Sequence, residues 1–61
     1  MNINNESLIQ LIKKRIIVTS SEVAEEFGVS WNTAEKYLME LLVGNKINRM
    51  KKTGVTLWML K

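Results

Sequence analysis

The chain lacks the residue types on which most enzyme and metal chemistry depends. Its 61 residues contain no cysteine, no histidine and no aspartate, and they form no Gly-rich phosphate loop. The usual general base, the thiol nucleophile and nearly every transition-metal site are thereby removed. The six glutamates are scattered along expected helices and do not pair in a recognisable pocket. We therefore expect no catalytic residue, no metal, no cofactor and no enzyme activity.

Proline and long apolar runs are also absent. No run approaches the ~20 apolar residues of a membrane span, and no signal peptide opens the chain, so a cytoplasmic protein is expected. No repeat or linker divides the sequence, which predicts a single domain over residues 1–61. With 46% apolar residues and two tryptophans the chain is globular, although a chain this short buries only roughly 60% of its unfolded surface.

Charge of one sign is missing from two stretches of the chain. Residues 16–29 hold three glutamates and no cation, whereas residues 46–61 hold five cations and no acid. Positive charge gathered at one end suggests a polyanionic partner. The net charge of +3 is also within the ordinary range for a small domain, so a solubilising charge mixture is the alternative interpretation.

Two short helices joined by a tight turn are predicted in the middle of the chain. The first spans residues 20–27, because Thr19 and Glu22 form the T-x-x-E pattern of a capping box. Its apolar stripe consists of Val23, Ala24 and Phe27. Gly28 then ends it, and a turn of three or four residues containing Gly is what a helix-turn-helix needs.

The second helix is predicted over residues 31–43. Ser30 is an N-cap type of residue, and Gly44 suits the left-handed C′ position. An apolar stripe at helical spacing is formed by Ala34, Leu38 and Leu41. The opposite side centres on Asn32 and Lys36, with Thr33 and Glu40 beside them.

The flanking segments complete the predicted pattern. A first helix over residues 5–14 is capped by Asn4 or Asn5, and its terminal cations Lys13, Lys14 and Arg15 suit the helix dipole better than a nucleic-acid contact. A β-branched strand follows at 16–18. A hairpin is predicted at 46–60, because two extended runs are separated by a short connection containing Gly54.

In the order of these elements, over about residues 5–60, the chain resembles the winged helix-turn-helix family of DNA-binding domains. The resemblance implies an α+β, mostly helical fold in which the short strand pairs with a C-terminal hairpin wing. It also implies Trp58 and Leu60 facing inward with Ile47. The function implied is sequence-specific binding of double-stranded DNA by a small transcription regulator, with helix 31–43 in the major groove and the wing on the backbone or minor groove.

Candidate DNA contacts follow from the chemistry of the groove. An Asn32 amide can pair with adenine, and Lys36 can donate to guanine O6 or N7. Thr33 suits a phosphate or a thymine methyl, and Ser30 and Tyr37 suit phosphates. The alternative is a solvated helix face, on which Lys36 forms a charge pair with the glutamate four residues later.

Three further features leave alternatives open. Trp31 lies at the edge of the apolar stripe and either covers the core or stacks on the sugar-phosphate backbone, while partial burial is favoured for Tyr37. In the hairpin, Arg49, Lys51 and Lys52 are expected to converge on the tip beside Thr53. Together with Lys36 and Lys46 they predict a salt slope of roughly −4 to −5, and a solvated wing is the alternative.

The last strand is apolar on both faces. Leu57 and Met59 are therefore expected to stay partly exposed and to form a homodimer contact, unless the segment around Ile3 covers them. The second function that we keep open is a protein-protein interaction module. It would use either the acidic helix 20–27 or this exposed face.

Overall fold

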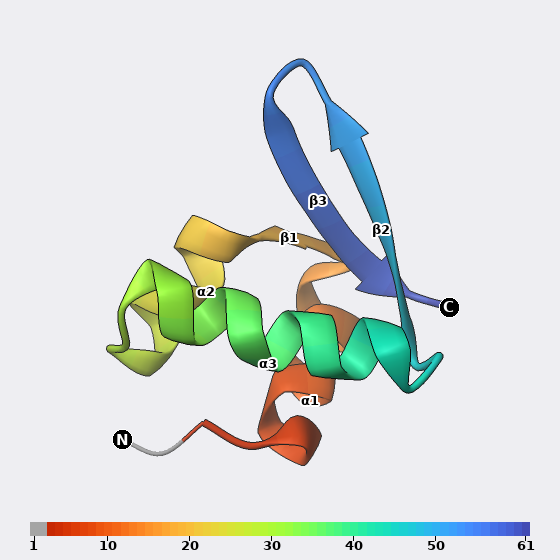
Figure 1. The fold of residues 1–61 in the computed structure, drawn as a ribbon. Coiled ribbons are helices and arrows are strands. Elements are labelled where there is room, and N and C mark those ends of the chain that lie inside the picture. The colour runs from red at the N-terminus through yellow and green to blue at the C-terminus, as the bar shows by residue number, and fades with distance from the viewer. Residues whose placement is uncertain (1–2) are drawn as a thin grey trace.

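The structure, a computed structural model, describes residues 3–61 as three helices and a three-stranded antiparallel sheet (Figure 1). The predicted fold class, α+β and mostly helical with a short strand and a C-terminal hairpin, is confirmed. Within residues 3–61, no helix combines the length and the apolar character needed to cross a membrane. The elements are α1 (Asn5–Arg15), β1 (Ile17–Thr19), α2 (Ser20–Phe27), α3 (Trp31–Val43), β2 (Ile47–Lys52) and β3 (Val55–Leu60).

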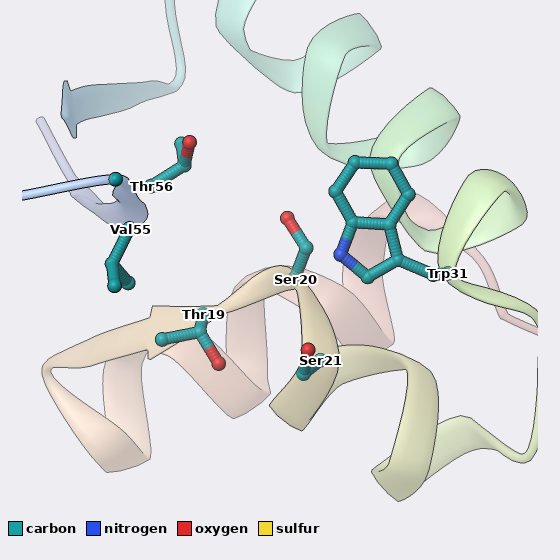
Figure 2. Close-up of a pocket in the computed structure, with 7 residues that line it drawn as sticks. Thr19, Ser20, Ser21, Trp31, Val55 and Thr56 are labelled. Atoms are coloured by element: carbon teal, nitrogen blue, oxygen red, sulfur yellow. The ribbon is translucent and has the colours of Figure 1, made fainter.

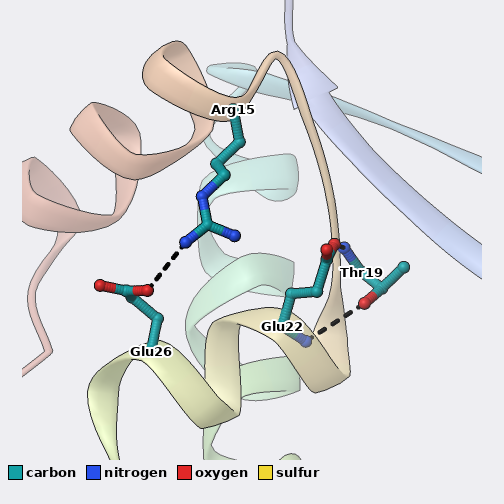
Figure 3. Close-up of polar contacts among 4 residues, drawn as sticks. All are labelled: Arg15, Thr19, Glu22 and Glu26. Carbon is teal, nitrogen blue, oxygen red and sulfur yellow. Dashed lines mark hydrogen bonds and ion pairs between the residues drawn. The ribbon is translucent and has the colours of Figure 1, made fainter.

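Each helix begins at a side chain that accepts a hydrogen bond from a free amide of the first turn. At α1 the cap is Asn4, whose Oδ1 accepts from the amide of Ser7 at 2.8 Å. At α2 the predicted capping box is present: the Glu22 amide donates to Thr19 Oγ1 at 3.1 Å, and the Thr19 amide donates to Glu22 Oε1 at 2.8 Å (Figure 3). At α3, Ser30 Oγ accepts from the third residue of the helix at 3.2 Å.

The two predicted glycine caps behave differently. Gly28 adopts the left-handed conformation at φ +64°, as expected for the turn between α2 and α3. Gly44 does not, because its φ is −75° and its ψ is 3°. The left-handed residue after α3 is Asn45, with φ +64°. The prediction for Gly44 was therefore wrong by one position, and Asn is the other residue that tolerates this conformation well.

Ile16 separates α1 from β1 in an unusual backbone conformation. Its φ is +75° and its ψ is −52°, and its amide donates to the carbonyl of Ile12 at 2.7 Å. This conformation ends the helix at Arg15, one residue later than predicted. It also excludes Ile16 from the sheet, so the strand occupies residues 17–19 and the predicted strand at 16–18 was one residue early.

The sheet has the strand order β1-β3-β2, so β3 pairs on both sides. Val18 lies opposite Trp58, and Ile47 lies opposite Leu60. These residues share the inner face of the sheet, which packs against the helices, and Trp58 is fully buried there. The predicted inward orientation of the inner-face residues is confirmed, with Leu60 half-buried against the core.

The core lies between this inner face and the helices. The apolar stripe of α3 is fully buried, as its spacing predicts, and consists of Ala34, Leu38 and Leu41. Ile3 also belongs to the core, and the described residues before α1 lie on the side of the molecule away from the hairpin (Figure 1). The alternative in which Ile3 covers Leu57 and Met59 is therefore wrong.

Candidate nucleic-acid interface

The first half of α3 presents a polar ridge to solvent. Asn32 and Lys36 are both exposed, and the buried stripe of the helix occupies the opposite side. Neither side chain forms a hydrogen bond or an ion pair with the rest of residues 3–61. Beyond Lys36 the exposed side carries the acidic Glu40 and the apolar Met39 and Val43. A carboxylate repels phosphates, so the candidate base-reading part of the interface is confined to the N-terminal half of the helix.

The two hydroxyls at the start of α3 serve the cap. Ser30 Oγ donates to Thr33 Oγ1 at 2.9 Å while it accepts from the amide of Thr33 at 3.2 Å. Thr33 is half-buried, and its own hydroxyl proton stays available for an outside acceptor. Ser30 thus has a structural role. Because its hydroxyl already donates and accepts a hydrogen bond within the helix cap, it is less available to contact a phosphate than the sequence suggests.

The two aromatic residues of α3 have different positions. Tyr37 is half-buried and packs against the core, which confirms the interpretation favoured for it. Trp31 is 52% exposed and does not belong to the core. Trp31 is therefore not part of the core, and the exposed half of its surface is available to a ligand. Stacking on the sugar-phosphate backbone stays a prediction.

Trp31 borders a pocket of about 190 Å³ between α3, the start of α2 and the hairpin. Figure 2 shows its indole facing Thr56 and Val55 of β3, with the start of α2 below them. Hydroxyl groups dominate the remaining wall, which is formed by Thr19, Ser20, Ser21 and Thr56. The strand β1 ends at Thr19, so the edge of β3 beside Val55 and Thr56 has no β1 partner. The pocket therefore combines an aromatic plane with several hydroxyls.

A buried hydrogen-bonded chain beneath this pocket was missed by the sequence analysis. Trp58 Nε1 donates to Ser20 Oγ at 3.0 Å, and Ser20 Oγ donates to Glu35 Oε2. Ser20 is only 4% exposed. The chain connects β3 to α2 and α3, and it draws the Glu35 carboxylate to the side of α3, away from the ridge of Asn32 and Lys36.

Arg49 connects the hairpin to α3. Its guanidinium lies over the ring of Trp58, with Cζ 5.8 Å from the ring centroid, and Nη1 donates to Met39 Sδ at 3.3 Å. This position is on the inner face of β2 and near α3. Arg49 therefore lies away from the hairpin tip, where the sequence analysis placed it.

The other hairpin cations divide between the two faces. Lys51 lies opposite Thr56 and shares the inner face with Arg49, whereas Lys52 lies opposite Val55 on the outer face. The predicted convergence of the three cations on the tip is therefore wrong, because alternate residues of a strand point to opposite sides of the sheet. Thr53 is exposed in the turn itself, at φ +50°.

The acidic side chains of α2 are largely engaged within the molecule. Glu22 completes the cap of the helix, and Glu26 Oε1 pairs with Arg15 Nη2 at 3.0 Å (Figure 3). The ion pair is exposed, so its contribution to stability is small. Among residues 3–61, no three side chains of the metal-ligating acidic, thiol or imidazole types gather closely enough to hold a metal ion.

Comparisons with known proteins place the chain in one family. No curated protein matches it. A family model described as a bacterial protein of unknown function matches residues 1–57, which include all three helices, β1, β2 and the first half of β3. The chain therefore belongs to the DUF977 family of bacterial proteins.

Proposed function

We propose that this protein binds double-stranded DNA through α3 and the inner face of the hairpin, and that it acts in the cytoplasm as a regulator of transcription. The observation that carries the proposal is the contact between Arg49 and Met39, at 3.3 Å. It joins the cationic face of β2 to the exposed side of α3. The polar ridge and the hairpin cations thereby form one continuous surface. Such a surface is needed if the helix and the hairpin are to contact the same duplex.

Each part of this surface has a role in the proposal. The N-terminal half of α3 enters the major groove, where Asn32 and Lys36 contact base edges. Lys51 and Arg49 neutralise phosphates of the strand that borders the groove. The pocket beside Trp31 lies between the helix and the hairpin, where this strand passes. Its hydroxyls suit a phosphate oxygen, except that of Ser20, whose proton is donated to Glu35.

The winged-helix resemblance of the sequence supports the proposal through the order of elements alone. A fold by itself does not decide function, so the argument depends on the exposed side chains. The alternative, a protein-binding module that uses the acidic face of α2, has less support. Two of the three glutamates on that helix, Glu22 and Glu26, already have partners within the chain.

An amide shift titration with duplex DNA tests the proposal and the alternative together. Uniformly labelled protein receives a random-sequence duplex at low salt, where phosphate contacts are strongest. The proposal predicts the largest shifts at residues 31–36 and 51–56. Shifts confined to α2, or no shifts at all with a saturating duplex, would overturn it.

A further inference from the structure

The outer face of the sheet carries an apolar patch that the helices leave uncovered. Cross-strand neighbours in this patch are Ile17 with Met59 and Met50 with Leu57. The exposed fractions of the side chains range from 70% for Ile16 to 45% for Ile17, and Leu57 and Met59 are half-buried. We call the outer apolar patch the set of Ile16, Ile17, Met50, Val55, Leu57 and Met59.

We propose that two copies of this chain associate through the outer apolar patch. Its six side chains carry no charge. On the same face of the sheet Asn48 lies opposite Met59, Lys52 lies opposite Val55 at the hairpin end of the patch, and Lys13 borders its other end. A second copy presents the same uncharged surface, so pairing two patches buries no unpaired charge. A charged partner would find no counter-charge within the patch.

The charges on the hairpin oppose edge-to-edge pairing of two β2 strands, which is another common way of joining two sheets. The outer edge of β2 is free, because β3 lies on its other side. Edge-to-edge pairing of two β2 strands would bring together two sets of cations, since each strand contains Arg49, Lys51 and Lys52. Lysines on an edge strand oppose such pairing, and the other edge strand, β1, offers only three residues for it. Face-to-face contact of the outer sides is therefore the arrangement that we infer.

The size of the patch sets the expected strength of association. Six side chains at these exposures form a patch of about 400 Å², within the range at which exposed apolar surface is often an interaction site. Two patches together bury about 800 Å², which is below the standard interface size and typical of weak association. We therefore expect weak, reversible association that requires high micromolar to millimolar protein.

This inference is independent of the proposed DNA interface. Apart from Val55, which also borders the pocket beside Trp31, the patch lies on the opposite side of the sheet from Arg49 and Trp58. Association therefore leaves the ridge of α3 free in both copies. Two copies on adjacent DNA sites would have an effective concentration in the millimolar range. Weak pairing through the patch is then sufficient to make their binding cooperative.

Sedimentation equilibrium of the full chain, from about 10 μM to about 1 mM, tests the proposal without DNA. We expect reversible dimerisation in the wild type and at least a ten-fold weaker association in Met50→Glu and Leu57→Glu. Met50 is 49% exposed, so its substitution removes little burial, and circular dichroism checks that each variant is folded. The matched control is Val43→Glu, because Val43 is 82% exposed on α3, outside the patch.

Three results would overturn the proposal. The first is a wild type that stays monomeric up to about 1 mM. The second is unchanged association in folded Met50→Glu and Leu57→Glu. The third is loss of association in Val43→Glu, which would place the contact on α3. A dimer that does not bind DNA would support this inference and contradict the proposed function. A protein that stays monomeric and binds DNA would do the reverse.

Discussion

Trp58 and Ser20 are joined by a buried hydrogen bond of 3.0 Å between residues 38 positions apart in the sequence. Ser20 passes the connection to Glu35 on α3. Because Ser20 is the middle member of this series of hydrogen bonds, it fixes the start of α2 relative to both β3 and α3. The placement of the candidate DNA-binding helix beside the hairpin depends on this small polar contact.

Replacing Ser20 by alanine is expected to cost about 2 kcal/mol of unfolding free energy, because the buried Trp58 Nε1 loses its acceptor. Urea denaturation measures the change, with Ser21→Ala as the control. Ser21 is exposed, and its substitution should change stability by less than about 0.5 kcal/mol. Equal effects of Ser20→Ala and Ser21→Ala would contradict the buried bond.

The sequence was sufficient to locate the helices because their signals are local. The T-x-x-E pattern at Thr19 and the spacing of Ala34, Leu38 and Leu41 act within one or two turns of the chain. The limits of α2 and α3 coincide with the predicted ones for this reason. The contact between Ser20 and Trp58 carries no local signal, since each residue is ordinary in its own segment.

The errors in the hairpin have a different cause. Counting alternate residues from Trp58 would have placed Arg49 and Lys51 on one face and Lys52 on the other, because the side-chain period of a strand is two. The same count reveals Met50 and Val55 beside Leu57. The strained conformation of Ile16 had no signal in the sequence, because a β-branched residue is unexpected at positive φ.

Gly28 and Gly44 provide a matched pair for testing the helix ends. Gly28→Ala is expected to cost about 1 kcal/mol, because a Cβ is disfavoured at φ +64° although the space around it is open. Gly44→Ala should be within about 0.5 kcal/mol of the wild type, because its φ is −75°. Thermal unfolding distinguishes the two variants. The reverse order would place the left-handed residue at Gly44.

Ile16→Gly is expected to stabilise the monomer. Glycine relieves the positive φ, and the lost isoleucine side chain is 70% exposed and contributes little burial. A gain of about 1 kcal/mol would raise the melting temperature of a domain this small by roughly 4–8 °C. The measurement belongs at about 10 μM protein, well below the concentrations at which association is expected. A lower melting temperature would show that Ile16 is not strained.

The two tryptophans should differ in access to a neutral quencher. Trp31 is 52% exposed and Trp58 is fully buried, so acrylamide should quench mainly the emission of Trp31. Trp31→Phe should leave a weakly quenched signal. Saturating duplex DNA should protect Trp31 in the wild type, because the proposed path of the backbone covers its indole. Protection that persists in Trp31→Phe would assign the change to Trp58 instead.

The salt dependence of duplex binding, followed by fluorescence anisotropy, tests the central claim most directly. Lys36, Arg49 and Lys51 lie on the proposed surface, while Lys52 lies on the outer face of the hairpin and Lys46 precedes β2. The structure thus lowers the expected slope of log K against log salt from the range that the sequence suggested to roughly −3. Lys36→Ala and Lys51→Ala should each reduce its magnitude by about 1, whereas Lys14→Ala, exposed on α1, should leave it unchanged. The account would be contradicted if the protein did not bind duplex DNA at low salt. It would also be contradicted if Lys36→Ala, Lys51→Ala and Lys14→Ala all had the same slope of log K against log salt.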